Sequence, residues 1–481
     1  MASETVVNLS SLSYDSALDI FSVPASNLGI KEVKYLEHRP RNTFNSESTI
    51  RFSVTGGAKE YFYLPETRLK IKARILNYDG SPIDPVLEKE FAAPIPKEDE
   101  DAGDAGDEVD AGVNDKKKRS YVSVINNFCN SLFEQVEVSF NDTVVSSGTT
   151  GYAHKALINT LLDSSDSAKN TRLQTAMYYP DTPGAMDSTD ITYFGLNEGL
   201  KKRHRFFNGS KPVEMTAKLD IDVFKLDRYL INGIRVGMIL HSTSTPFRLM
   251  SQLDNPSFKI EIMDICLVMC HVQPTGPVLV AHQDLMKNEN RLARYDYVKE
   301  EVRKFSISHG HTTFECTDMF QDRCPDRMVF VLCTSSSVGG SYTLNPYNFH
   351  HHNLVSIDLK VHGERIPCGE IKMDFDRGHY AQAYEALFST TKPRYISDLS
   401  HSTCGISYDD FRKGYAVFAV DLNPATRSGS FYPTRQQGEV SIALQFSKPL
   451  KETVLLLCVT YSPAYFEIDH LRGVYLGKPG P

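Results

Sequence analysis

The chain has 481 residues and a mass of 54.1 kDa, about three times the usual length of one domain, so two large domains are expected. With 41% hydrophobic and 23% charged residues it can bury sizeable cores, which excludes wholesale disorder. Its formal net charge of −8 is matched by an acidic run at residues 98–110, and a remainder without surplus positive charge argues against sequence-specific nucleic-acid binding.

Neither the first residues nor the apolar stretches predict export or a membrane span. Residues 1–10 lack the basic and apolar regions of a signal peptide. Apolar stretches such as residues 454–459 are far shorter than the roughly 20 residues that cross a bilayer. We therefore expect no membrane span and no classical secretion, and we assign residues 1–45 to an N-terminal arm.

Alternating apolar residues predict that most of the chain is β-strand. The segments with this pattern, or with a short apolar run, are residues 50–54, 69–76, 136–140, 213–223, 234–240, 259–265, 328–332, 357–361, 440–446 and 454–459. Only residues 153–161 and 380–388 place apolar side chains at the spacing of a helix face. Strands and helices do not alternate regularly, so we predict an all-β fold of antiparallel sheets with a few short helices.

The two halves of the chain align with one another, which indicates an internal duplication. Asn127-Phe128 aligns with Asn348-Phe349, and the hairpins that follow align strand with strand and turn with turn. The remaining blocks, in chain order, pair residues 51–54 with 304–307, the helix 153–161 with 380–388, and residues 213–219 with 440–446. Two unrelated β-domains that share only generic alternation are the alternative interpretation.

The duplication predicts two tandem eight-stranded jelly rolls, a double jelly roll, because this arrangement packs two sheets face to face and leaves few exposed edges. The expected boundaries are an N-terminal arm at 1–45, a first jelly roll at 46–250, a bridging segment at 251–299, a second jelly roll at 300–470 and a C-terminal tail at 471–481. The first unit is longer than the second, and we assign the difference to an insert at about 85–118.

Charged clusters mark the surface. The insert at 85–118 contains the acidic run and is rich in Asp, Ala and Gly, so we expect a mobile surface loop. Two basic clusters, Lys116 to Arg119 and Lys201 to Arg205, are interpreted as solvated flanks, with a nuclear import signal as the alternative.

No constellation of residues predicts catalysis, a cofactor or a metal. The nine cysteines are scattered through apolar runs, as buried thiols of a reducing compartment are. Cys266 and Cys270 lie in a segment that alternates like a strand, which is unsuited to a zinc site. His350-His351-His352 aligns with Cys129-Asn130-Ser131 of the first half, which argues against metal binding by these histidines. His309 and His311 align with a turn. Phosphate-cradling, nucleophile-elbow and dinucleotide-binding motifs are absent from the sequence, so we expect no enzyme and assign no catalytic, cofactor or metal residue.

Several segments resemble one protein family. The segments are residues 127–145, the helix at 152–162, Asp227 to Gly233, Asn345-Pro-Tyr-Asn-Phe349 and the closing Phe466 to His470. They resemble the hexon-like, double jelly-roll major capsid proteins of Polinton (Maverick) elements and adintovirus-like DNA viruses. The resemblance spans nearly the whole chain beyond about residue 40, and it is weak at the acidic insert.

The resemblance implies a structural role in a virion. A hexon-like major capsid protein forms a homotrimer whose six similar lobes make a pseudo-hexagonal block, and such blocks tile an icosahedral shell around a double-stranded DNA genome. The implied partners are neighbouring capsomers, penton and minor capsid proteins, and assembly takes place in the host nucleus or cytoplasm. The implied location of the chain is the capsid.

Two other functions remain open at this point. A vertex or minor capsid protein, or a glycan- or receptor-binding β-sandwich, requires solvent-facing aromatic side chains in loops such as Tyr178-Tyr179, Tyr342 and Phe431-Tyr432. An enzyme on a cupin-like sandwich requires a stoichiometric metal ion.

Overall fold

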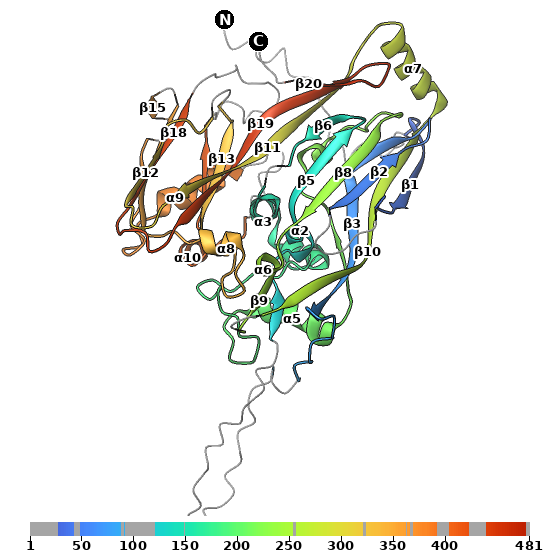
Figure 1. The fold of residues 1–481 in the computed structure, drawn as a ribbon. Helices are drawn as coiled ribbons and strands as arrows, with labels where there is room; N and C mark the ends of the chain where they lie inside the picture. The colour runs from blue at the N-terminus through green and yellow to red at the C-terminus, as the bar shows by residue number, and fades with distance from the viewer. Residues whose placement is uncertain are drawn as a thin grey trace, which may run out of the picture.

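The computed structural model describes residues 27–42, 49–87, 91, 121–148, 150–253, 256–320, 324–361, 363–365, 369–391, 404–422 and 439–477. Within these residues the chain folds into two β-sandwiches that lie side by side (Figure 1). The acidic run, the basic cluster at 116–119, the aromatic pair at 431–432 and most of the N-terminal arm lie outside the described residues.

The first sandwich consists of two four-stranded antiparallel sheets. One contains, in spatial order, β1 (Ile30–His38), β10 (Phe258–Pro274), β3 (Tyr61–Asn77) and β7 (Val213–Ala217); the other contains β2 (Ile50–Thr55), β8 (Arg235–Ser242), β5 (Phe133–Phe140) and β6 (Thr143–Ser146). A small sheet of β4 (Val122–Val124) and β9 (Leu249–Ser251) adjoins them. Alternation explains the packing: in β2, Ile50, Phe52 and Val54 are buried in the common core while the residues between them face outwards.

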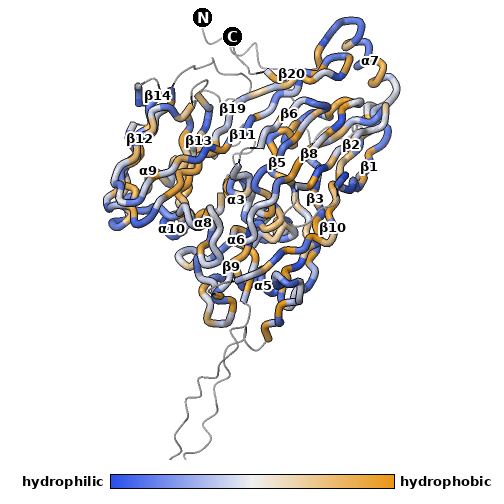
Figure 2. The backbone as a smooth tube through the Cα atoms, in the orientation of Figure 1, coloured by the Kyte–Doolittle hydropathy of each residue, from blue (hydrophilic) through white to orange (hydrophobic). Residues whose placement is uncertain are grey.

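The second sandwich has the same plan. One sheet contains β11 (Ala293–Ile307), β19 (Val454–Ile468), β13 (Arg327–Thr334) and β17 (Val417–Asp421), with β20 (Val474–Gly477) beside β19; the other contains β12 (Thr313–Cys316), β18 (Val440–Phe446), β14 (Leu354–Val361) and β15 (Glu364–Arg365), with β16 (Ile371–Lys372) beside β14. In Figure 2 the strands of both sandwiches carry hydrophobic residues between hydrophilic ones, as expected for sheets with one buried face.

The strand order confirms the duplication. When the eight main strands of each sandwich are numbered in chain order, both sandwiches have the order 1-8-3-6 in one sheet and 2-7-4-5 in the other. This is the connectivity of a jelly roll, in which first and last strands pair and both sheets contain strands from both halves of the unit. Each of the ten predicted strand segments lies in, or overlaps, an observed strand.

Two of the aligned blocks are correct and two are wrong. The hairpin β5–β6 matches β14–β15, with a positive φ at Asn141 in one turn and Gly363 in the other. The alignment of 51–54 with 304–307 places β2 on the end of β11, but the strand equivalent to β2 is β12. The alignment of 213–219 with 440–446 places β7 on β18, but the strand equivalent to β7 is β17. Alternation of period two is common to every half-buried strand, so it cannot by itself identify which strand corresponds to which.

Three expected boundaries also need correction. The N-terminal arm contains the edge strand β1, the bridging segment contains β10 and the start of β11, and the C-terminal tail contains β20. The sequence pattern does not predict β1, because both faces of this strand are largely exposed and carry Lys and Glu, which is typical of edge strands and removes the alternation.

Short helices fill the loops between the strands. Those of the first sandwich are α2 (Phe128–Ser131), α3 (Tyr152–Asp163), α4 (Asp166–Lys169), η3 (Arg172–Ala176), α5 (Glu198–Phe207), η4 (Asn208–Ser210), η5 (Asp222–Lys225) and α6 (Thr245–Arg248). The helix α7 (Gly276–Lys287) connects the sandwiches, and α8 (Ser335–Gly339), α9 (Ala381–Thr391) and α10 (Tyr408–Arg412) belong to the second. The predicted helices at 153–161 and 380–388 are confirmed as α3 and, almost entirely, α9.

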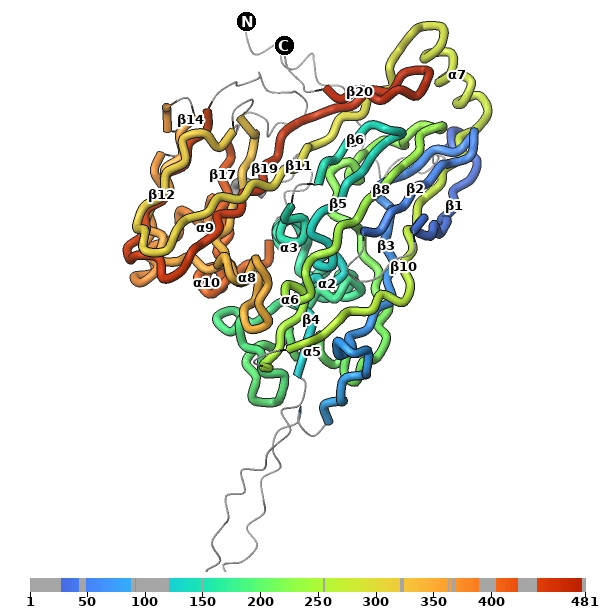
Figure 3. Tube along the Cα trace, viewed as in Figure 1, coloured from blue at the N-terminus to red at the C-terminus, as the bar shows by residue number. Residues whose placement is uncertain are grey.

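The long strand pair β11–β19 belongs to both sandwiches. The two strands are paired over 15 residues and run side by side from α7 to the far end of the second sandwich (Figure 3). Near α7, their residues Tyr295, Tyr297, Ala464 and Phe466 are part of the core of the first sandwich, whereas Val302 and Val459 lie in the core of the second. The two cores therefore share one pair of strands.

Candidate functional site at the junction of the two sandwiches

The junction of the two sandwiches is built around α3. This helix lies between them (Figure 1), and its side chains are buried on opposite sides. Tyr152 and Ala156 pack in the first core, whereas Leu157 and Leu161 pack in the second. A helix that is apolar on more than one side is expected where it is enclosed by protein, so α3 joins the two sandwiches.

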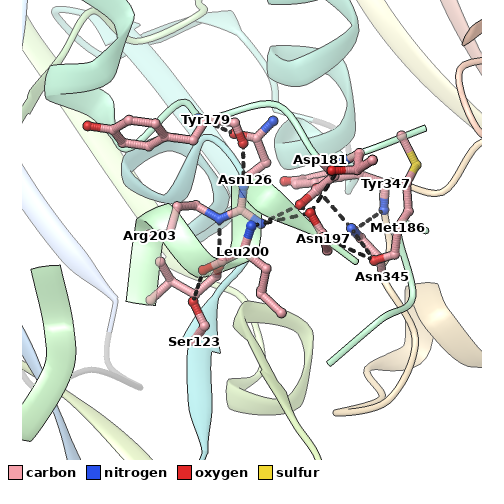
Figure 4. Close-up of polar contacts among 12 residues, drawn as sticks. Ser123, Asn126, Tyr179, Asp181, Met186, Asn197, Leu200, Arg203, Asn345 and Tyr347 are labelled. Atoms are coloured by element: carbon pink, nitrogen blue, oxygen red, sulfur yellow. Dashed lines mark hydrogen bonds and ion pairs between the residues drawn. The ribbon is translucent and has the colours of Figure 1, made fainter. Parts of the chain in front are cut away.

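A fully buried arginine organises the polar side of the junction (Figure 4). The Arg203 side chain, on α5, is 0% exposed and pairs with Asp181, which is 2% exposed, with 2.5 Å between Nη2 and Oδ1. Its Nε donates to the carbonyl oxygen of Val124 at 2.8 Å, and Nη1 donates to that of Tyr179. Because the guanidinium is charged and desolvated, these fixed acceptors are needed to offset the cost of its burial.

The same carboxylate reaches the second sandwich. Asp181 Oδ2 accepts a hydrogen bond from Asn345 Nδ2 at 2.9 Å, and its backbone carbonyl accepts one from the Tyr415 hydroxyl at 2.8 Å. Nearby, Asp187 accepts hydrogen bonds from the Asn345 amide at 2.7 Å and from the Asn348 side chain at 2.6 Å. The loop at 181–187 of the first sandwich is thereby fixed against residues 345–348 of the second.

A second buried charge network lies at the other side of α3. Lys155 Nζ is 2.9 Å from Glu300 of β11 and 3.5 Å from Asp220, and Lys225 is 2.7 Å from both carboxylates. Asn159 donates to Asp220 at 2.7 Å and to Glu300 at 3.0 Å. Opposite charges thus alternate across the junction.

This arrangement shifts the ionisation of its members. Burial acts to raise the pKa of Asp220, but Lys225 and Lys155 outweigh it and lower that pKa to about 2. Burial acts to lower the pKa of Lys155, and the carboxylates of Glu300 and Asp220 outweigh it, so this pKa is raised. Both groups therefore remain charged over the physiological range of pH.

The basic cluster Lys201 to Arg205 is part of this junction. Arg203 is completely buried and His204 is 3% exposed, so the cluster does not present a continuous basic surface. The interpretation of this cluster as a solvated flank is therefore wrong at Arg203 and His204. The alternative of a nuclear import signal is also wrong here, because such a signal must be accessible to its receptor. Its counterpart at 116–119 lies outside the described residues.

The three consecutive histidines are packed against aromatic rings. The ring of His351 stacks on Phe375 at 3.9 Å between centroids and on His350 at 4.5 Å. Burial, and secondly the neighbouring histidines, lower the pKa of His351 to about 3, and burial with His350 lowers that of His352 to about 4. Among the described residues, no group of three or more His, Cys, Asp or Glu side chains is placed to hold a metal ion.

The cysteines that the structure describes are all free thiols. Seven of these eight are buried, and Cys316 is partly exposed. Burial raises the pKa of the Cys129 thiol to about 12, which leaves it protonated and unreactive at neutral pH.

The aromatic residues required for glycan binding are not all accessible. Tyr178 is 1% exposed and lies in the core of the second sandwich. Tyr179 and Tyr342 are half-buried. The hypothesis that Tyr178 faces solvent is wrong, because the loop at this position turns inwards to pack at the junction.

The junction residues were not predicted as functional from the sequence. Arg203 appeared only as a member of a basic cluster, and Asn345 only as part of a family-like segment. A single sequence offers one weak signal, the recurrence of Asn-Phe before a strand in both halves, at Asn127 and Asn348. Both asparagines lie close to the junction contacts.

A cavity of about 700 Å³ lies between α7 and the first sandwich. Its lining includes Tyr61, Val272, Val278, Leu285 and Tyr295. It is the size of a small-ligand site.

In the described residues no helix is both long and apolar enough to cross a membrane.

Comparison with known proteins identifies the fold. No family model matches the sequence. A chain of the Sputnik virophage structure matches with a TM-score of 0.59 and 10% identity, covering 98% of this chain and 93% of its own. The mavirus major capsid protein matches with a TM-score of 0.52 and 12% identity over 98% of this chain and 96% of its own, and the Faustovirus major capsid protein with 0.51 and 10% over 96% and 93%.

These neighbours are double jelly-roll capsid proteins, so the chain has the double jelly-roll fold. In sequence, it is 21% identical over 459 residues to an uncharacterised protein of Caenorhabditis elegans, which covers 94% of this chain and 98% of that protein. The likeness extends over both sandwiches and the junction between them.

Proposed function

We propose that this chain is a hexon-like major capsid protein, a structural component of a virion shell. The observation that carries the proposal is the repeated 1-8-3-6 and 2-7-4-5 strand order, in two sandwiches fused by a buried junction. The same architecture, over more than nine-tenths of both chains, occurs in the major capsid proteins of mavirus and Faustovirus. A fold alone hosts many functions, but this chain matches those proteins over both of its units.

The proposed assembly is a homotrimer. Three chains with two similar sandwiches each supply six lobes, so a closed threefold ring has a nearly hexagonal outline. Such blocks tile an icosahedral shell around a double-stranded DNA genome, in contact with neighbouring capsomers, penton and minor capsid proteins. The rigid junction supports this proposal, because both lobes of each chain are held in one fixed relation.

We assign the chain a structural and not a catalytic role. At the junction, the buried Arg203 donates to Asp181 and to backbone carbonyls, and Asp181 also accepts from the side-chain amides of Asn197 and Asn345. Their geometry serves to hold the two sandwiches together. The proposed origin is the Polinton or adintovirus-like lineage, and the proposed location is the capsid, assembled in the host nucleus or cytoplasm.

Native mass tests this proposal. A stable trimer has a mass of about 162 kDa, three times 54.1 kDa. Light scattering after gel filtration is expected to give this value at all practical dilutions, since obligate interfaces bury several thousand Å². Electron microscopy of the overexpressed protein is expected to show pseudo-hexagonal blocks or hollow shells. A monomer at high concentration, without shells, would refute the proposal.

A further inference from the structure

The helix α7 is poorly packed on its inner side. Within this helix only Met286 is buried, although Val278, His282, Leu285 and Met286 follow helical spacing and all face the cavity of about 700 Å³. The opposite wall is formed by Tyr61 and Tyr295 of the first core, and the Tyr61 hydroxyl lies 2.9 Å from Nδ1 of His282. An apolar stripe that faces a cavity leaves much of its surface without a packing partner.

The chain before residue 27 begins at the rim of this cavity. Asn27, Gly29 and Ile30 are part of its lining, and β1 starts at Ile30. Residue 21 is six residues before Asn27, which corresponds to a reach of about 20 Å for an extended chain. The sequence preceding Asn27 includes Leu18, Ile20, Phe21 and Val23, so apolar side chains are available within reach of the cavity.

The charges of the two parts are complementary. Residues 1–26 contain three acids, Glu4, Asp15 and Asp19, and no Lys or Arg. The cavity lining contains Arg228, Arg291 and Arg294 against a single acid, Asp227. Arg228 and Arg291 lie 3.9 Å from Asp227 and 3.6 Å from Glu289, and their side chains are 58% and 69% exposed, so an acidic segment can still approach them.

We propose that residues 18–23 of the chain dock in this cavity of the same chain, with Ile20 and Phe21 against the inner side of α7 and Asp19 near the arginines. This contact fastens α7, which connects the two sandwiches, to the first sandwich. It involves one chain only, so it does not depend on the proposed capsid function, and a monomer can show it as well as a trimer.

A tryptophan at position 21 tests the proposal in the full-length protein. The natural chain contains no tryptophan, so Phe21→Trp introduces a single emitter. Docking is expected to shift its emission to shorter wavelength and to protect it from quenching by acrylamide. Emission typical of a fully exposed indole, with unhindered quenching, would overturn the proposal. In that case an external amphiphile would be the alternative occupant of the cavity, and mass spectrometry of an organic extract would detect it.

Two valines on the same helix supply a matched pair of variants. Val278 faces the cavity, whereas Val280 is 56% exposed and is not part of the lining. In the Phe21→Trp background, Val278→Asp is expected to abolish the blue shift, because it places a carboxylate in the apolar site and opposes the acidic segment. Val280→Asp is expected to leave the shift unchanged. Equal effects of both variants would contradict docking at the cavity, and circular dichroism establishes that both are folded.

Co-refolding distinguishes docking within a chain from docking between chains. The double variant Phe21→Trp, Val278→Asp is refolded with an excess of the natural chain, which has no tryptophan and an intact cavity. If residues 18–23 dock in their own chain, the emission stays red-shifted. A return of the blue shift would show that the segment enters the cavity of a second copy and would overturn the proposal in its present form.

Discussion

Lys155 of the first sandwich and Glu300 of the second form a buried ion pair, with 2.9 Å between Nζ and Oε2 and side-chain exposures of 9% and 4%. Asp220 and Lys225 complete the network. Pairs of this kind add little stability relative to an apolar core of equal volume. Removal of one member, however, leaves the charge of the other buried without a partner. The network therefore fixes how the two sandwiches are oriented.

The first prediction follows from this pair. Lys155→Met is expected to lower the free energy of unfolding by about 3 kcal/mol, the low end of the cost of orphaning a buried charge, since Lys225 still neutralises part of Glu300. Urea titration measures the change. The control is Lys299→Met, which removes a half-exposed pair with Glu301 and is expected to cost less than about 1 kcal/mol. Equal losses would contradict the assigned role.

A second prediction concerns Asn345. Its side chain joins Asp181 of the first sandwich to the second, and Asn345→Ala leaves Asp181 Oδ2 without this donor. The expected cost is about 1–3 kcal/mol, the price of an unsatisfied buried acceptor. Asn345→Asp is expected to cost more, because it brings a second carboxylate to Asp181. Thr343→Ala, two residues upstream and exposed, serves as the control in thermal unfolding and is expected to be nearly neutral.

A third prediction is a loss of stability in acid. His154 is buried between Phe247 and Tyr347, and burial, followed by the nearby Lys304, lowers its pKa from 6.5 to about 3. Between these values the unfolded chain binds a proton that the folded chain excludes. Stability is therefore fully present above pH 6.5 and falls as the pH decreases towards 3, by about 1.4 kcal/mol per pH unit for this residue.

His154→Gln is expected to remove that contribution. The variant retains a donor for the Pro346 carbonyl, which lies 3.2 Å from His154 Nε2, but it does not titrate. The free energy of unfolding is measured from pH 7 to pH 4. Its slope against pH is expected to be smaller in the variant than in the parent by the contribution of about one bound proton. His351 and His352 retain their own contributions, so some acid sensitivity remains. Parallel curves for variant and parent would disprove the assignment.

A fourth prediction tests whether the sandwiches unfold together. Phe466 lies on β19, stacks on Tyr295 at 4.8 Å between centroids and fills the core of the first sandwich. Phe466→Ala is expected to cost about 3–5 kcal/mol and to lower the stability of both sandwiches in a single transition. Leu471→Ala, at a position 77% exposed, is expected to change stability by less than about 0.5 kcal/mol. Two separate transitions would contradict the shared core.

Much of the fold was predictable because its strands have one solvent-exposed face and one buried face. Residues 50–54 and 440–446 alternate clearly and were correctly assigned. The duplicated hairpin was also recognisable, because both turns contain residue types that tolerate positive φ. Asn141 and Gly363 do adopt it in the structure. The edge strand β1 and the helix α7 were not predicted, since neither has a strongly buried face.

The junction was not predictable for a different reason. Arg203 and Asp181 are 22 residues apart, Asp181 and Asn345 are 164 apart, and nothing local indicates that they meet. A Lys/Arg run on a helix normally faces water, and its periodicity does not show that one member points inwards. Buried polar contacts between distant segments depend on tertiary structure, which a single sequence does not report.

Through the strand pair β11–β19, the interior of each sandwich depends on the other. A gene cut at α7 would leave Tyr295 and Phe466 on the second fragment, while Phe140, whose ring packs against Phe466, would remain on the first. Neither fragment would keep a closed interior. Any change in one half therefore has to be compatible with the other half of one inseparable molecule.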